Sequence, residues 1–105
     1  MKEGSVAKGY VVVVENIHDQ AGYQGYVAKA GGTIAAYGGR LLILSDDAEL
    51  IEGEWPWQRT LVLEFPSVEK AHEWYNSPEY QAIVGERHAS ADANTVIVGG
   101  FEMPG

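Results

Sequence analysis

Four short runs of β-branched and leucine residues punctuate this sequence and constrain its fold more than any other feature. They lie at residues 10–14, 40–44, 59–65 and 95–98. Within VVVV, LLIL, LVL and VIV the residues are apolar at successive positions. Because successive side chains of a strand point to opposite faces of a sheet, both faces of a sheet built from these runs are predicted to be buried.

A helical pattern fills the segment between the first two runs. Apolar residues recur there at spacings of three and four, as along one face of an amphipathic helix. The stripe consists of Tyr23, Tyr26, Val27, Ala30, Ile34 and Tyr37. Asp19 is a suitable N-cap, and Gly38-Gly39 is expected to end the helix. Gly31-Gly32 lies inside the stripe and predicts a weak point or bend rather than a phosphate-binding loop, which would need its glycines between a strand and a helix.

A second helical region follows the third run. Ser67 is placed to cap it, and its inward face is expected to use Val68, Ala71, Trp74 and Tyr75. The stretch WYNSPEYQ then ends one helix at Asn76 and starts another at Ser77-Pro78, because serine caps helices and proline suits the first helical position. This restarted helix is expected to run toward Ala89.

The order of elements is therefore strand, helix, strand, strand, helix, strand. That order predicts an α+β fold of ferredoxin-like βαββαβ type with a four-stranded antiparallel sheet. Residues 9–100 form one domain, with a frayed lead-in at 1–8 and a tail at 101–105. Two helical regions cover only one face of such a sheet, so a second copy of the chain is expected to cover the other, giving a homodimer through the sheet face.

Composition excludes several classes of partner. Seven Lys and Arg against fifteen Asp and Glu give a formal net charge of -8, which argues against binding to nucleic acid or to an anionic membrane. Without cysteine there is no thiolate nucleophile and no Cys-ligated metal. The N-terminus lacks the apolar core of a signal peptide, and no run approaches the roughly 18 apolar residues of a membrane helix, so a cytoplasmic location is expected.

Several short motifs resemble one known family. They are KGY at the first strand, AYGGR at 36–40, EGEW at 52–55, LEFPS ending at Ser67, and WYNSPEYQ at 74–81. Together they resemble the domain-of-unknown-function family numbered 1330, over about residues 8 to 100. That family belongs to the dimeric α/β barrel superfamily, so the resemblance implies a ferredoxin-like dimer. It implies no activity, although superfamily relatives include cofactor-free oxygenases, lactone isomerases, cyclases and haem enzymes, often with a pocket between sheet and helices.

Two side chains are candidates for catalysis. His72 lies at the rim of the second helix's apolar face, where an imidazole could act as a general acid or base; the alternative is an exposed boundary histidine. Arg87 precedes the last strand and could clamp a substrate carboxylate, or pair with a helix neighbour such as Glu86 or Glu79. Arg87 fits the family pattern, whereas His72 and His88 depart from it.

Aromatic side chains are the candidates for shaping a pocket. Tyr37, Trp74, Tyr75 and Asn76 are predicted to bind substrate. The aromatic residues suit a small apolar or aromatic molecule. The Trp55-Pro56-Trp57 stretch is expected on a hairpin connection, as a dimer contact in preference to a pocket lid.

No metal and no cofactor are predicted. The three histidines lack metal-ligand spacing, and Asp46-Asp47 is interpreted as a solvated turn. Two hypotheses remain open: a cofactor-free enzyme (isomerase, cyclase, decarboxylase or monooxygenase type) acting on a small apolar or aromatic metabolite, or a non-catalytic ligand-binding or structural dimeric module. A haem-dependent function is a weaker third, since it needs a histidine in the pocket.

Overall fold

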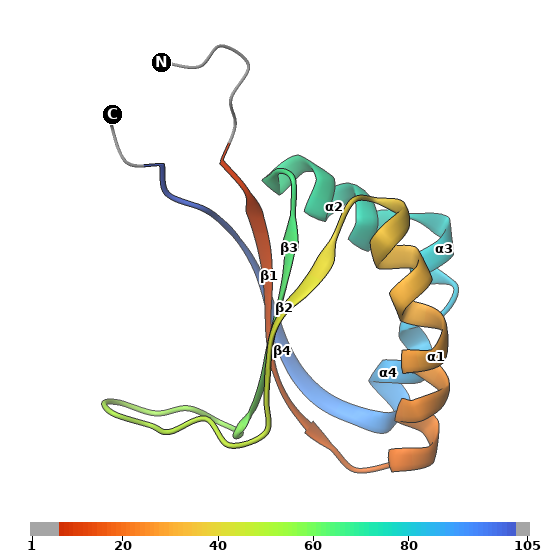
Figure 1. Ribbon diagram of the computed structural model, residues 1–105. Coiled ribbons are helices and arrows are strands. Elements are labelled where there is room, and N and C mark those ends of the chain that lie inside the picture. The colour runs from red at the N-terminus through yellow and green to blue at the C-terminus, as the bar shows by residue number, and fades with distance from the viewer. Residues whose placement is uncertain (1–6, 103–105) are drawn as a thin grey trace.

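The protein folds as a four-stranded sheet covered on one face by helices, as Figure 1 shows. The computed structural model describes residues 7–102. Its elements are β1 (Gly9–Ile17), α1 (Gln20–Ala36), β2 (Arg40–Ser45), β3 (Arg59–Phe65), α2 (Val68–Asn76), α3 (Pro78–Gln81), α4 (Val84–Ser90) and β4 (Ala91–Gly99). The predicted order of strands and helices is confirmed. Most of the expected lead-in, residues 1–6, and residues 103–105 of the expected tail lie outside the described residues.

The strands run in the order β2-β3-β1-β4, and every neighbouring pair is antiparallel. This is the strand order of a ferredoxin-like sheet, with the first and third strands at the centre. In the register of β1, Val11 lies opposite Leu63 of β3, and Glu15 lies opposite Arg59. Side chains alternate between the two faces of a strand, so Val11, Val13 and Glu15 share the face that the helices cover.

A β-bulge in β2 changes which of its leucines face the helices. Leu41 pairs with Leu63 and Ile43 with Val62, so Leu42 is the extra residue. After the bulge Leu44 returns to the same side as Leu41, and both line the space beneath the helices.

The ends of α1 lie where the sequence predicts them. Asp19 caps the helix by accepting a hydrogen bond from the Gly22 amide (3.1 Å), and Gly38 follows it with φ +79. The helix is continuous through Gly31-Gly32. Both glycines are exposed, and no other heavy atom lies close to where their side chains would project.

The WYNSPEYQ stretch is the predicted junction between two helices. Ser77 accepts a hydrogen bond from the Tyr80 amide (3.1 Å) and donates one to the Trp74 carbonyl (2.8 Å), so one hydroxyl ends α2 and starts α3. Pro78 occupies the first position of α3.

The restarted helix and the last strand differ from the prediction. The helix stops after Gln81 and begins again at Val84, giving two short helices in place of one. Strand β4 starts at Ala91 instead of Thr95. The ADAN segment at its start has low β propensity, but pairing with β1 from Ile17↔Ala91 onward supplies its backbone hydrogen bonds, and tertiary pairing overrides local preference.

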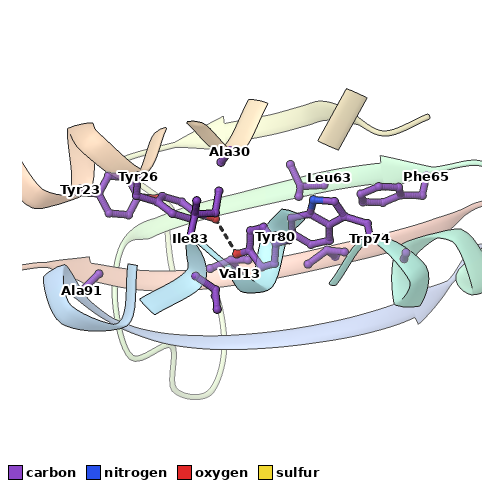
Figure 2. Packing of buried hydrophobic residues seen from close by; sticks show 13 residues of the cluster. Val13, Tyr23, Tyr26, Ala30, Leu63, Phe65, Trp74, Tyr80, Ile83 and Ala91 are labelled. Carbon is purple, nitrogen blue, oxygen red and sulfur yellow. Dashed lines mark hydrogen bonds between the residues drawn. The ribbon is translucent and has the colours of Figure 1, made fainter. Parts of the chain in front are cut away.

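A row of aromatic rings joins the helices to the sheet (Figure 2). Phe65 of β3 contacts Trp74 of α2, with ring centroids 5.3 Å apart, and Trp74 contacts Tyr80 of α3 at 4.1 Å. Tyr80 lies 6.2 Å from Tyr26, and Tyr26 lies 5.6 Å from Tyr23, both on α1. We call these five rings the aromatic row.

No described helix is both long enough and apolar enough to cross a membrane.

The opposite face of the sheet is apolar and uncovered in the single chain. Ile43, Val62, Val12 and Val96 lie in register across all four strands. Ile43 is 47% exposed and Val96 is 53% exposed. The connection at residues 46–58 extends past the sheet on the side away from the helices, as Figure 1 shows, and its exposed side chains include the large apolar residues Leu50, Ile51 and Trp55.

Gly9 allows the start of α2 to rest directly on β1, and this contact makes a testable prediction. A Cβ at Gly9 would lie 2.4 Å from the Ser67 carbonyl oxygen and 2.6 Å from the Val68 nitrogen. Because these are backbone atoms, Gly9→Ala is expected to destabilise the fold by about 1–3 kcal/mol, measured by urea denaturation. In the control Gly85→Ala, no atom lies within 4 Å of the new methyl, and a stabilisation of up to about 1 kcal/mol is expected. Equal stability of the two variants would contradict the tight contact.

Candidate functional site

A cavity of about 230 Å³ lies between the sheet and the helices. Aliphatic side chains from the central strands, β2 and α1 form much of its wall, among them Val11, Val13, Ala30, Leu44 and Leu61. Four rings of the aromatic row, Tyr23, Tyr26, Trp74 and Tyr80, also line it, together with Tyr75. Two arginines and one glutamate stand in this largely apolar wall, and their partners determine what the cavity can bind.

Arg87 is the first of these charged groups. It lies on α4 near the helix C-terminus, where a cation is favoured by the helix dipole, and it is only 6% exposed. No carboxylate among residues 7–102 forms an ion pair with it. Burial disfavours its charge, but the neighbouring Tyr80, Tyr26 and Tyr75 outweigh burial and raise the pKa of Arg87, which is therefore a cation at neutral pH.

A pair of tyrosine hydroxyl groups lies beside Arg87. The Tyr26 and Tyr80 oxygens are 2.7 Å apart, and either hydroxyl can donate (Figure 2). Burial, together with the contact to Tyr80, raises the pKa of Tyr26 well above its ordinary value. Tyr26 therefore keeps its proton and does not neutralise the guanidinium of Arg87.

Glu15 is the second charged group, and its side chain is fully buried. Its Oε2 accepts hydrogen bonds from the Tyr23 hydroxyl and from Nε of Arg59 (2.9 Å). Its Oε1 is buried and has no hydrogen-bond partner in the described part of the chain. A buried charged oxygen without a partner costs on the order of 1–3 kcal/mol or more.

Arg59 links Glu15 to the protein surface. Its Nη1 donates to the exposed Asp46 (2.6 Å), and its guanidinium lies 5.6 Å from the centroid of the Tyr23 ring. Burial works against the charge of Arg59, but its bonds to Asp46 and Glu15 outweigh burial and raise the pKa of Arg59. The Tyr23 pKa is also raised, first by burial and then by the bond to Glu15.

A polar cleft of about 600 Å³ adjoins the cavity. Asn16, Gln20, Asp46, Trp57 and Gln58 are among its lining residues. Four side chains line both spaces: Glu15, Tyr23, Val27 and Arg59. Glu15 and Arg59 therefore stand at the boundary between an apolar interior and a polar opening.

Three of the six predicted site residues line the cavity. They are Trp74, Tyr75 and Arg87. Tyr37 is half-buried outside the cavity, and its hydroxyl donates to Glu79 at 3.3 Å. The predicted alternative for Arg87, pairing with Glu86 or Glu79, is not formed: Glu86 pairs with Lys29 (2.7 Å), and Glu79 accepts the hydrogen bond from Tyr37.

His72 and Asn76 lie on the exposed side of α2. One residue along a helix turns by roughly 100°, so His72 faces away from the core position of Ala71. The Asn76 amide donates to the His72 carbonyl (3.0 Å) and so binds the end of its own helix. Neither residue lines the cavity.

The remaining histidines are also outside the cavity. His18 and His88 are both exposed, and His18 lies 3.9 Å from Asp92. Among the cavity's lining residues there is no histidine, so they do not fit a histidine-ligated haem. Within residues 7–102, no three His, Cys, Asp or Glu side chains gather as a metal site would require.

Sequence reasoning missed Glu15, Arg59 and the tyrosine hydroxyl pair. A signal for Glu15 was present, since it follows Val11 and Val13 at the alternate spacing of the inward face. Its partner Arg59 is 44 positions away, and only the pairing of β1 with β3 brings the two together.

These features define a class of protein. The strand order and the one-sided helix layer are those of a ferredoxin-like α+β fold. The chain belongs to the family described as Domain of unknown function (DUF1330), which matches residues 8–101. No curated protein is a significant match to this chain.

Solved structures share this fold at low sequence identity. The RPA0582 protein of unknown function from Rhodopseudomonas palustris has a TM-score of 0.76 and 16% identity, over 92% of this chain and 85% of that chain. SnoaB, a cofactor-independent oxygenase from Streptomyces nogalater, has a TM-score of 0.63 and 11% identity, over 92% and 96%. A dimeric ferredoxin-like protein from Bacteroides fragilis has a TM-score of 0.50 and 13% identity, over 88% and 95%.

The tyrosine hydroxyl pair makes a prediction for stability. Tyr26→Phe and Tyr80→Phe each leave the partner hydroxyl without its bond, so each is expected to cost about 1–3 kcal/mol in chemical denaturation. The double variant is expected to cost little more than either single variant, because the same bond is lost once. As a control, Tyr37→Phe removes only a long exposed hydrogen bond (3.3 Å), and a change within about 0.5 kcal/mol is expected. Additive effects of Tyr26→Phe and Tyr80→Phe would show that the hydroxyl groups are not coupled.

Proposed function

We propose that this protein binds a small aromatic or apolar anion in the cavity beneath its helices and acts on it without a cofactor. The observation that carries the proposal is Arg87, a buried guanidinium that has no carboxylate partner in the described chain and lines a cavity walled by aromatic rings.

The electrostatics of Arg87 favour an anionic ligand. Removing a charge from water is costly unless a counter-charge compensates it. Tyr80 and Tyr26 are the nearest polar neighbours of Arg87, and Tyr26 gives it no negative charge, since its raised pKa keeps its proton in place. A carboxylate or enolate would provide that charge, and the planar guanidinium fork matches a carboxylate with two parallel hydrogen bonds.

The size and wall of the cavity restrict the ligand further. Its volume of about 230 Å³ is below the range of about 300–1,000 Å³ typical of drug-sized sites. Its lining is dominated by aliphatic and aromatic side chains. A compound with one aromatic ring, or an apolar metabolite of similar size, suits this space.

The chemistry we propose uses groups that line the cavity. Glu15 and the hydroxyl groups of Tyr26 and Tyr80 can move protons or stabilise developing charge, as isomerisation, cyclisation, decarboxylation or oxygenation requires. These groups take the acid–base role that the sequence suggested for His72, whose side chain is exposed. SnoaB, described as a cofactor-independent oxygenase, supports this chemistry by analogy of fold.

The role of Arg87 can be tested by ligand binding. Benzoate is expected to bind the wild-type protein at least about tenfold more tightly than benzamide, by calorimetry or NMR titration, because only benzoate carries a charge. Arg87→Met is expected to remove this preference while the melting temperature stays equal or rises, since an apolar side chain replaces an uncompensated buried charge. Arg87→Lys is expected to keep part of the preference.

Two outcomes decide between hypotheses. If wild-type protein binds neither benzoate nor larger aromatic carboxylates such as 1-naphthoate, the anion-binding proposal is wrong. If carboxylates bind but every one in a broad panel is recovered unchanged after prolonged aerobic incubation, the non-catalytic module becomes the better description.

We further propose that the functional unit is a homodimer formed through the uncovered sheet face. The apolar row across the four strands and the exposed side chains of residues 46–58 form one apolar surface that a second copy would bury. The Bacteroides fragilis protein of the same fold is described as dimeric, which supports the proposal. In this assembly Trp55 is a dimer contact, as its sequence context suggests.

Charge placed on this face is expected to break the dimer. Val96→Lys puts a cation at the β4 end of the apolar row, and we expect the dimer dissociation constant to rise at least about tenfold in size-exclusion chromatography with light scattering. Ala28→Lys adds the same charge on the exposed side of α1 and is expected to leave the dimer intact. A wild-type protein that is monomeric at micromolar concentration would overturn the proposed assembly.

A further inference from the structure

The unpartnered oxygen of Glu15 points to a second recognition element in the cavity. Glu15 is 1% exposed, and its Oε1 has no hydrogen-bond partner in the described chain. Its Oε2 already accepts bonds from Tyr23 and Arg59. The known partners therefore hold one carboxylate oxygen in place and leave the other without a donor.

A purely structural role does not account for this arrangement. Val11 and Val13 precede Glu15 on the same face of β1 and fill their sites with apolar groups. A carboxylate at the third site loses its hydration on folding, which costs free energy. Because a buried polar atom without a partner gains no hydrogen bond in return, that desolvation cost remains in the folded state. Arg59 does not offset the desolvation cost of Oε1, because its Nε binds Oε2 of Glu15 and its Nη1 binds Asp46.

Three tyrosines that line the cavity connect Glu15 with Arg87. Glu15 binds the Tyr23 hydroxyl; the Tyr23 and Tyr26 ring centroids are 5.6 Å apart; and the Tyr26 hydroxyl lies with that of Tyr80 beside Arg87. The cavity lining thus holds both a hydrogen-bond acceptor, Oε1 of Glu15, and a cation, Arg87.

We propose that Oε1 of Glu15 accepts a hydrogen bond from an O–H or N–H group of the ligand whose anionic end binds Arg87. The ligand class is then a single-ring aromatic acid that carries a hydroxyl or amino group. This inference rests on the proposed function, because it needs Arg87 to bind the anionic end. Glu15 positions and selects the ligand through Oε1, which has no partner among the described residues.

The test compares ligands that differ only in their donor. The 2-, 3- and 4-hydroxybenzoates are titrated against their methyl ethers and against benzoate, using calorimetry or NMR. At least one hydroxybenzoate is expected to bind wild-type protein at least about tenfold more tightly than its methyl ether, because the ether offers no hydrogen to Oε1. Comparing ring positions locates the donor relative to the carboxylate.

The matched variant is Glu15→Gln, which keeps the shape of the side chain and one oxygen for Tyr23 and Arg59. Its amide group presents hydrogens where Oε1 of glutamate would accept, so the preference for the hydroxyl compound is expected to disappear. Benzoate affinity is expected to change less than about threefold, since benzoate has no donor for Glu15. A shift in melting temperature does not affect this readout, which is a ratio of two affinities measured on the same protein.

The possible failures are distinguishable. If benzoate and all the substituted benzoates fail to bind, the anion site at Arg87 is absent and the proposed function fails. If benzoate binds through Arg87 but hydroxyl and methoxy compounds bind equally well to wild-type protein, the Glu15 inference alone is overturned. The same conclusion follows if the hydroxyl preference survives unchanged in Glu15→Gln.

Discussion

Contact between the aromatic row and the sheet is the interaction on which the rest of this structure depends. Phe65 anchors the row on β3, Trp74 and Tyr80 extend it through α2 and α3, and Tyr26 and Tyr23 carry it along α1. Large rings bury much apolar area, and tilted pairs add to it. Because rigid rings leave space between the helix layer and the smaller valines of β1, the same packing that holds the fold together also bounds its cavity.

Charge in this interior is distributed unevenly. Arg59 is compensated by Glu15 and by Asp46, whereas Arg87 has tyrosine hydroxyl groups and no carboxylate within the described chain. Stable interiors usually pair their buried charges. Among the described residues, Arg87 has no carboxylate partner and Glu15 has one unpaired oxygen, and both line the same cavity. Charged groups in such perturbed surroundings are common in binding sites.

Much of the fold could be predicted because its signals are local. Asp19, Ser67 and Ser77 cap helices within three residues of their own positions. The site was harder to predict. Trp74, Tyr75 and Arg87, which line the cavity, were singled out because rings and an arginine stand out in the sequence, whereas His72 was favoured for its chemistry and its side chain is exposed. The early start of β4 was missed because its first residues favour a strand only when β1 is beside them.

By itself the sequence determined the order of the elements, the capping residues and the apolar character of both sheet faces, since each depends on neighbours a few positions apart. Tertiary structure alone decided which polar groups meet. The pairing of Glu15 with Arg59 depends on the register of β1 with β3, and the inward turn of Leu44 depends on the bulge in β2. Arg87 does not pair with its neighbour Glu86, because Glu86 forms an ion pair with Lys29 on α1. Contacts between distant residues follow from packing geometry, which no local pattern encodes.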